Sequence, residues 1–284
     1  MKTYNDIYLE TRNALRASGI EGYTLEARLL VATAAGKSVA ELLRDINLYT
    51  TAAIDAEVQE LTRRRLAGEP VAYITGAWEF YGLPMKVTPD VLIPRMDTEL
   101  LVTTAKELLL GRKMDARILD LCCGSGCIAC ALGHELPATK LVAVDISANA
   151  LEIARENFAS NRLGSRAICI QADATSSPPM SIGQFDMIVS NPPYISSAEI
   201  MTLDASVRDY EPIWALDGGE DGYRFYKAII KYWKSLLRPG GFLLFEVGEG
   251  QAATVKEMLS SAGFRAVGSR LDTLNIERVV IGKM

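Results

Sequence analysis

The sequence contains no apolar run of the length that a membrane-spanning helix needs. Residues 1–6 also lack the apolar core of a secretory signal peptide. From these absences we expect a cytoplasmic protein that has no membrane partner. Basic residues are not in excess either, since the net charge is −5. This charge argues mildly against nucleic acid as a direct substrate, although a local basic patch could be hidden in the total.

Disulfide bonds are not expected for the five cysteines of such a cytoplasmic chain. Four of them, Cys122, Cys123, Cys127 and Cys130, lie close to the only histidine, His134, and a group of this composition could bind a metal. However, Cys122 and Cys123 would point in opposite directions if both still belonged to a strand. We therefore expect no metal here, and interpret the cysteines as small residues of a tight loop and the helix after it.

The length of 284 residues suffices for one large domain and a smaller one, and the 49% hydrophobic content predicts a sizeable core. Residues 1–70 predict helices throughout, with apolar residues at helical spacing in 5–17 and 55–67. Thr24 is expected to cap a second helix that ends near residue 35. Ser38 and Glu41 form a capping box that opens a third helix. No motif with obvious chemistry occurs here, so we expect this small bundle to recognise a partner.

The composition changes after the bundle. We expect residues 1–75 to form the recognition domain and residues 76–90 to form a linker hairpin, because 78–87 alternate around a turn. Residues 91–284 would form the catalytic domain. It is expected to begin with a helix from Asp97 or Thr98 to Leu110.

From Arg117 onward, strand and helix patterns alternate, which predicts a parallel α/β sheet. The expected strands are 118–121, 141–145, 167–171, 185–190 and 241–247, and residues 264–267 and 278–281 would pair as a closing hairpin. The expected helices are residues 147–161, 221–237 and 251–262.

A glycine loop, Gly124-Ser125-Gly126, follows the first of these strands and leads into a helix. Glycine lets the backbone approach a ligand closely, and the N–H groups at a helix start point toward it. The next strand ends at Asp145, at a distance typical of an acidic residue that binds ribose hydroxyls. The glycine pattern Gly-x-Gly-x-x-Gly is absent, so the loop is not the motif of dinucleotide-binding proteins.

Asn191-Pro192-Pro193-Tyr194 follows the buried strand 185–190. Proline restricts the residue before it and removes an N–H, so the strand must end in a stiff, extended corner. The Asn191 side-chain oxygen and the Pro192 carbonyl, held at a fixed spacing, can accept both hydrogens of an –NH2 group. Tyr194 would pack against the acceptor group, or equally would anchor the loop in the core. The alternative is a proline turn that merely ends the strand.

Asn-Pro-Pro-Tyr at a strand end resembles the motif of S-adenosylmethionine-dependent methyltransferases that act on planar –NH2 nitrogens. The segment from Asp120 to Gly126 is similar to the first motif of these enzymes. The resemblance implies a Rossmann-like α/β methyltransferase sheet behind the helical bundle, S-adenosylmethionine as cofactor and S-adenosylhomocysteine as product. Asp173 would accept the adenine amino group or would be only a turn residue, and Ala174 stands where the family often has an adenine-stacking aromatic. The cofactor-binding residues implied are Cys122, Cys123, Gly124, Ser125, Gly126, Asp145, Ile146, Asp173, Ala174 and Asn191.

Three further segments narrow the resemblance to the release-factor glutamine methyltransferases. They are Phe80–Leu83, the run Val91-Leu92-Ile93-Pro94-Arg95 with Thr98-Glu99, and Tyr210-Glu211-Pro212 with Ala215–Gly219. This resemblance implies methylation of the side-chain amide nitrogen of the glutamine in the Gly-Gly-Gln motif of class 1 peptide-chain release factors. Two alternatives stay open: an amino-methyltransferase acting on adenine or guanine of RNA or DNA, and an S-adenosylmethionine-binding or scaffold protein without catalysis. The implied catalytic residues are Asn191, Pro192 and Tyr194, and the implied substrate-binding residues are Asn191, Pro192, Pro193, Tyr194 and Arg95.

Overall fold

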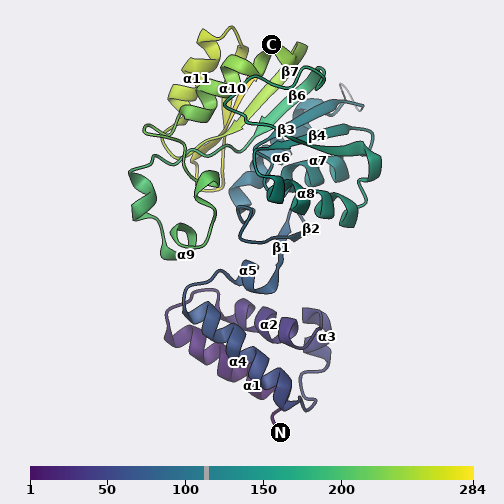
Figure 1. Ribbon diagram of the computed structural model, residues 1–284, viewed down its shortest axis with the longest axis vertical. Helices are drawn as coiled ribbons and strands as arrows, with labels where there is room; N and C mark the ends of the chain where they lie inside the picture. The colour runs from purple at the N-terminus through teal and green to yellow at the C-terminus, as the bar shows by residue number, and fades with distance from the viewer. Residues whose placement is uncertain (112–114) are drawn as a thin grey trace. The chain divides into compact units, whose positions relative to one another are not determined.

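The computed structural model describes residues 1–111 and 115–284. The chain divides into two compact units (Figure 1). The first unit contains Met1–Ala77 and Asp204–Tyr210, and the second contains Trp78–Leu203 and Glu211–Met284. The domain limits expected at residues 75 and 90 stay predictions, and each unit is described by itself.

The first unit is helical, as its sequence pattern predicts. Its α-helices are α1 (Tyr4–Ala17), α2 (Tyr23–Ala34), α3 (Val39–Arg44), α4 (Ala52–Leu66), α5 (Val71–Thr75) and α9 (Ala205–Arg208). The capping box of Ser38 and Glu41 is present at the start of α3, which confirms that prediction. The prediction that Thr24 caps α2 is wrong, because α2 begins at Tyr23 behind Gly22 and has no side-chain cap. α4 begins earlier than expected, because Thr51 caps it by accepting the Ile54 N–H.

The short segment Asp204–Tyr210 belongs to the first unit although the chain around it belongs to the second. The Tyr210 hydroxyl donates a hydrogen bond to the carbonyl of Ala67, just after α4, at 3.0 Å. The Tyr210 ring also lies over Gly68, where an added Cβ would meet it at 3.5 Å. The segment is thus held by the residues that follow α4.

The second unit is built on a seven-stranded sheet of order β5-β4-β3-β6-β7-β9-β8. Its strands are β3 (Arg117–Leu121), β4 (Lys140–Asp145), β5 (Ala167–Gln171), β6 (Phe185–Ser190), β7 (Leu237–Glu246), β8 (Arg265–Leu271) and β9 (Glu277–Lys283). A separate hairpin joins β1 (Ala77–Phe80) to β2 (Leu83–Lys86). The five strands β3 to β7 run parallel to one another, and β9 pairs antiparallel with β7 and β8. The expected α/β class is confirmed.

Helices cover both faces of this sheet (Figure 1). The side chains of β3 alternate between the faces: Ile118 packs in one core and Leu119 in the other. The first core includes residues of α6 (Glu99–Leu109), α7 (Cys127–Glu135) and α8 (Ala148–Ser160). The second core includes residues of α10 (Arg224–Tyr232) and α11 (Ala252–Ser261). Both faces are buried, which explains the nearly continuous apolar strands.

The chain reverses its direction of winding at β3, which lies between β4 and β6. Leu121, the last residue of β3, is in register with Val144 of β4 and with Ser190 of β6. The residues that follow these strands therefore lie side by side at the carboxyl edge of the sheet. Such a switch point is where ligands bind in open α/β sheets.

Several expected boundaries differ from the structure. α10 is shorter than expected, because Gly222 has a φ of +74° and β7 already starts at Leu237. The closing strands β8 and β9 are longer than the residues that predicted them. Among the described residues, no helix combines the length and the apolar character that crossing a membrane requires.

Candidate active site

The glycine loop and Asp145 form one hydrogen-bonded arrangement at the ends of β3 and β4. The Gly124 N–H donates to Asp145 Oδ2 at 2.9 Å, and the Ser147 N–H donates to Asp145 Oδ1 at 3.0 Å. Gly124 has a φ of +51°, and a Cβ added there would meet no protein atom within 4 Å. The loop backbone is thus open to a ligand beside a carboxylate held by hydrogen bonds. Burial raises the pKa of the Asp145 carboxyl, although the backbone N–H donors lower it.

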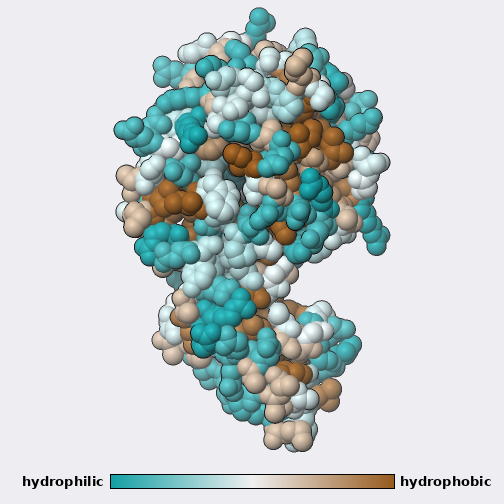
Figure 2. Space-filling model, in the orientation of Figure 1, coloured by the Kyte–Doolittle hydropathy of each residue, from teal (hydrophilic) through white to brown (hydrophobic). Residues whose placement is uncertain are grey.

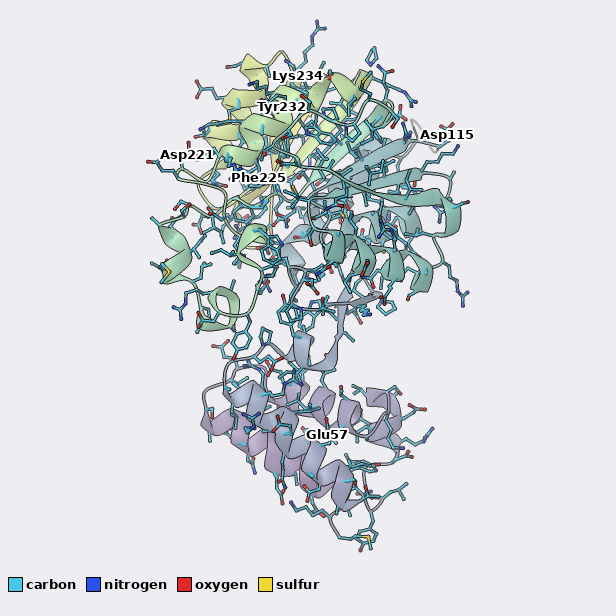
Figure 3. The ribbon with its side chains drawn as sticks, in the orientation of Figure 1. Glu57, Asp115, Asp221, Phe225, Tyr232 and Lys234 are labelled. Carbon is cyan, nitrogen blue, oxygen red and sulfur yellow. The ribbon has the colours of Figure 1, made fainter. Side chains whose placement is uncertain are left out.

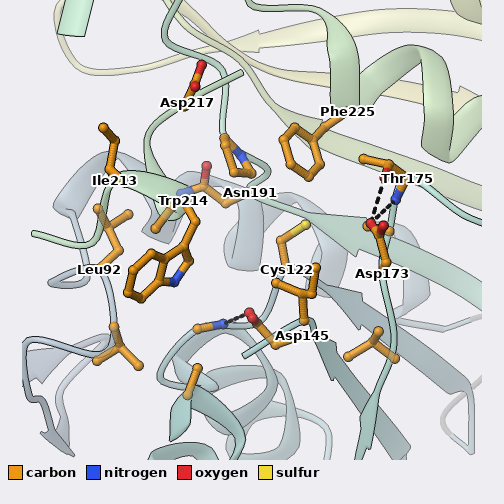
Figure 4. Close-up of a pocket in the computed structure, with 18 of the residues that line it drawn as sticks. Leu92, Cys122, Asp145, Asp173, Thr175, Asn191, Ile213, Trp214, Asp217 and Phe225 are labelled. Carbon is orange, nitrogen blue, oxygen red and sulfur yellow. Dashed lines mark hydrogen bonds between the residues drawn. The ribbon is translucent and has the colours of Figure 1, made fainter. Parts of the chain in front are cut away.

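A cavity of about 370 Å³ opens at this edge of the sheet (Figure 4). The ends of four neighbouring strands contribute to it, together with the segments that precede α6 and α10. Its lining residues are Asp90, Val91, Leu92, Cys122, Gly124, Val144, Asp145, Ile146, Ala150, Ala172, Asp173, Ala174, Thr175, Asn191, Pro193, Ile213, Trp214, Ala215, Asp217, Arg224 and Phe225. Its size is within the range of ordinary small-molecule sites.

The structure brings most of the implied cofactor residues to this cavity. Those that line it are Cys122, Gly124, Asp145, Ile146, Asp173, Ala174 and Asn191. Cys123, Ser125 and Gly126 are buried and are not among the lining residues. The Ser125 carbonyl accepts a hydrogen bond from the Asn157 side chain, and a Cβ on Gly126 would meet the Phe158 ring at 2.8 Å. These residues shape the loop from behind, and their contact with a cofactor stays a prediction.

Asn191 lies where the proline corner was expected, directly after β6. Its Nδ2 donates to the Thr98 hydroxyl at 3.1 Å, which leaves Oδ1 as the end of the carboxamide available for a ligand. Figure 4 shows Asn191 at the cavity, between Trp214 and Phe225. Pro193 also lines the cavity, whereas Pro192 is buried and is not among the lining residues.

Tyr194 does not line this cavity. It lines a second hollow of about 600 Å³, with residues such as Glu199 and Gln251. Gln251 holds the corner in place, because its Nε2 donates to the Tyr194 carbonyl at 2.9 Å. Burial raises the pKa of the Tyr194 hydroxyl above its usual range, so the ring stays neutral. The geometry favours an anchoring role for Tyr194, and its assignment as catalytic stays a prediction.

Asp173 is both a turn residue and a cavity residue. Its Oδ1 accepts hydrogen bonds from the N–H and the hydroxyl of Thr175, both at 2.7 Å. Its Oδ2 accepts one from the Ser176 hydroxyl at 3.3 Å. These bonds fix the carboxylate, and its place at the cavity leaves it able to accept another donor.

Two aromatic residues of the cavity, Phe225 and Trp214, were not predicted from the sequence. Phe225 lies in the first turn of α10 (Figure 3), on the same side of the cavity as Asp173 and Thr175 (Figure 4). Trp214 lies on the side of Leu92 and is about half exposed, at 53%. Figure 2 shows hydrophobic side chains reaching the surface of the second unit among hydrophilic ones. Isolated aromatic residues in a loop and a helix gave no periodic signal that could have placed them here.

Arg95, which the resemblance placed at the substrate, has a protein partner. Its guanidinium forms an ion pair with the buried carboxylate of Glu211, which also accepts the Ile93 N–H. Arg95 is not among the lining residues of the cavity. The pair joins two segments that bear the narrower resemblance, and a contact of Arg95 with substrate stays a prediction.

The cysteines are free thiols. Burial raises the pKa of both Cys122 and Cys123 well above the usual value, so neither is a thiolate near neutral pH. Within residues 1–111 and 115–284, no group of three or more histidine, cysteine, aspartate or glutamate side chains is arranged to hold a metal.

Comparison with known proteins gives the family of the chain. The family model described as "PrmC N-terminal domain" matches residues 6–76, and the one described as "Methyltransferase small domain" matches residues 96–206. The "Release factor glutamine methyltransferase" of Bradyrhizobium diazoefficiens is 42% identical over 250 residues, covering 87% of this chain and 83% of the relative. The protein of the same name from Geobacter sulfurreducens is 40% identical over 274 residues, covering 96% of this chain and 94% of the relative.

Among solved structures, the hMettl16 catalytic domain in complex with MAT2A 3′UTR hairpin 6 matches with a TM-score of 0.59 at 18% identity. The match covers 78% of this chain and 81% of that one, and it bears on the fold alone. The relatives are similar enough over enough of their length to decide the family. The chain belongs to the release factor glutamine methyltransferases.

Proposed function

We propose that this protein transfers the methyl group of S-adenosylmethionine to the side-chain amide nitrogen of the glutamine in the Gly-Gly-Gln motif of class 1 peptide-chain release factors. The observation that carries the proposal is the orientation of Asn191. Its amide nitrogen is engaged by Thr98, and its oxygen is left for a hydrogen-bond donor at a cavity that also holds the glycine loop and Asp145.

The residues of the cavity fit S-adenosylmethionine. Each Asp145 oxygen accepts one backbone N–H, which leaves a lone pair on each for the two ribose hydroxyls. The bare backbone at Gly124 suits the methionine end, and Asp173 suits the adenine amino group. Phe225, close to Asp173, would supply the aromatic contact that Ala174 lacks. When bound, the cofactor supplies an electrophilic methyl group on a sulfonium sulfur.

The protein contributes orientation and electrostatics to the reaction. An amide nitrogen is a poor nucleophile because its lone pair is delocalised into the carbonyl. Hydrogen bonds from the substrate –NH2 to Asn191 Oδ1 and to the Pro192 carbonyl would fix the nitrogen and offset the positive charge that develops on it. Pro193 has no N–H, so no neighbouring donor competes for the Pro192 carbonyl.

The partner implied by this reaction is a folded release factor, a protein of the cytoplasm. A nucleic-acid substrate would be held by many lysine and arginine contacts to phosphate. The net charge of −5 and the acidic residues Glu199, Asp221 and Glu249 around the second hollow disfavour such a partner.

The proposal is tested by tritiated methyl transfer from S-adenosylmethionine to three acceptors: an intact release factor, a short Gly-Gly-Gln peptide and purified RNA. We expect methylglutamine in the hydrolysed release factor, weak labelling of the peptide and none of the RNA. An Asn191→Ala variant should bind the cofactor normally and transfer methyl groups slower by orders of magnitude. Labelled RNA with an unlabelled release factor would establish the nucleic-acid alternative instead.

A further inference from the structure

The reaction proposed above requires one particular orientation of the Asn191 carboxamide. A carboxamide can turn either its oxygen or its –NH2 toward a ligand, and the two ends have nearly the same shape. Only the oxygen can accept a hydrogen from the substrate nitrogen; the –NH2 would repel it. Something in the protein must therefore hold Asn191 in one of the two orientations.

Thr98 is the direct partner of the Asn191 –NH2 group. Thr98 is only 2% exposed and ends the 3-10 turn Met96–Thr98 before α6. Its hydroxyl accepts from Asn191 Nδ2 at 3.1 Å. It makes no side-chain cap for α6, so its oxygen accepts no backbone N–H of that helix. A buried hydroxyl that accepts in this way needs an acceptor for its proton.

The carboxyl of Glu246 can serve as that acceptor. It is 2% exposed and ends β7, the parallel neighbour of β6. Ser190 and Phe245 are in register, so Asn191 and Glu246 are the next residues across the two strands. The side chains of Thr98 and Asn191 lie close enough to the Glu246 carboxyl to lower its pKa. Its Oε2 is buried and has no hydrogen-bond partner among the described residues, so it is an acceptor still available for a donor.

We propose that Thr98 and Glu246 are positioning residues that lock the Asn191 carboxamide with Oδ1 toward the substrate nitrogen. An ionised carboxylate can only accept hydrogen bonds. Thr98 therefore donates its hydrogen to Glu246, its lone pair accepts from Asn191 Nδ2, and the direction of the whole chain is fixed. Neither residue lines the cavity.

The charge of Glu246 decides this direction, because a protonated carboxyl could donate to Thr98 and release the lock. Burial raises the pKa of Glu246 to about 7, against the hydrogen bonds from Thr98 and Asn191 and the positive charge of Arg278 on β9. Asp97 adds negative charge from the turn before α6. The remaining groups that face Glu246 are Tyr194, Tyr226 on α10 and Cys127 on α7, and burial raises the pKa of each.

The decisive experiment compares Thr98→Val with Thr98→Ser in the full-length protein acting on an intact release factor. Valine keeps the shape of threonine and removes the hydroxyl, whereas serine keeps the hydroxyl and removes the methyl. We expect Thr98→Val to lower kcat at least tenfold, which corresponds to about 1.4 kcal/mol, and Thr98→Ser to stay within about threefold of wild type. Cofactor affinity, measured by calorimetry, and thermal stability should be similar in both. Equal losses of kcat in the two variants would show a packing role and overturn the proposal.

A pH series tests Glu246. Wild-type kcat should fall as the pH drops below about 7, where the Glu246 carboxyl takes up its proton, and Glu246→Gln should lose this dependence. A Glu246→Gln variant that keeps the wild-type profile would remove Glu246 from the lock.

A readout without turnover separates this inference from the proposed function. In ¹⁵N NMR spectra of the cofactor-free protein, the Asn191 side-chain –NH2 should be protected from exchange and should shift with a midpoint near pH 7, in wild type and in Thr98→Ser. The protection should be lost in Thr98→Val, and the pH-dependent shift should be lost in Glu246→Gln. Unchanged signals in Thr98→Val would refute the lock, whatever the substrate is. Failure of the wild-type enzyme to methylate a release factor, with the NMR result intact, would refute only the proposed function.

Discussion

Removing the Asp145 carboxylate should weaken cofactor binding by an amount that the geometry allows us to work out. In the structure, each oxygen already accepts one backbone N–H, from Gly124 at 2.9 Å and from Ser147 at 3.0 Å. One further lone pair on each oxygen is left for a ribose hydroxyl. Hydrogen bonds to a charged group contribute about 1.5–3 kcal/mol each. Asp145→Ala should therefore cost about 3 kcal/mol or more, a loss of ~150-fold in affinity.

Asp145→Asn is the sharper probe, because it keeps the shape. Its –NH2 group cannot accept a hydrogen bond, so it must face either the Gly124 or the Ser147 N–H donor to donor. We expect an intermediate loss of affinity together with a lower Tm. Asp145→Ala would be free of this conflict. The pair of variants thus separates the ribose contacts from the loop contacts.

The assay is calorimetric titration with S-adenosylhomocysteine, with Asp115→Ala as the matched control because Asp115 is exposed. Burial raises the pKa of Asp145, so affinity should begin to fall at a higher pH than its ordinary value of 3.8 implies, and Asp145→Asn should not show this fall. Binding by folded Asp145→Ala within about threefold of wild type would refute the assignment.

Three further outcomes are expected. Phe225→Ala should weaken cofactor binding about 5- to 150-fold, because stacking on a base contributes ~1–3 kcal/mol. The affinity of Phe225→Leu should lie between those of the wild type and Phe225→Ala. Unchanged affinity in calorimetry would remove Phe225 from the adenine site. Gly126→Ala should destabilise the fold by about 1–3 kcal/mol in urea unfolding, because the new Cβ would meet Phe158 at 2.8 Å at a φ of +75°. Gly164→Ala, with a φ of +57° and open space, should show only the backbone part of that cost, so equal costs would contradict the clash. Burial raises the pKa of Glu246 from 4.5 to about 7, so its contribution to folding is fully present below pH 4.5 and is lost as the pH rises to 7. Relative to Glu246→Gln, the wild type should lose about 3 kcal/mol of unfolding free energy across that window. Stability curves that run parallel for the two proteins would argue against the shift.

The parts of the structure that could be predicted are those specified by neighbouring residues. The alternation of apolar strands and helices predicts the sheet. The glycine loop with Asp145, and Asn191 before two prolines, identify the switch point because strand ends in a parallel sheet meet at one edge. The prediction that Thr24 caps α2 was wrong because the helix already begins behind Gly22.

The parts that could not be predicted depend on residues far apart in the chain. Thr98, Asn191 and Glu246 come from three segments and meet only after the sheet has formed. Phe225 reaches the cavity because α10 starts after Gly222, a position set by a φ of +74°. No local pattern distinguishes such a phenylalanine from an ordinary core residue, so side chains of this kind require a three-dimensional structure.

The segment Asp204–Tyr210 has a consequence for attempts to divide the protein. The chain passes between the two units after Ala77, after Leu203 and after Tyr210. A fragment that begins at Trp78 would retain Tyr210 but lose the Ala67 carbonyl that its hydroxyl binds. Residues 204–210 would then be separated from the unit to which they belong. A clean catalytic fragment must also replace residues 204–210 with a short linker, and a helical bundle exchanged from a relative must bring its own version of that segment.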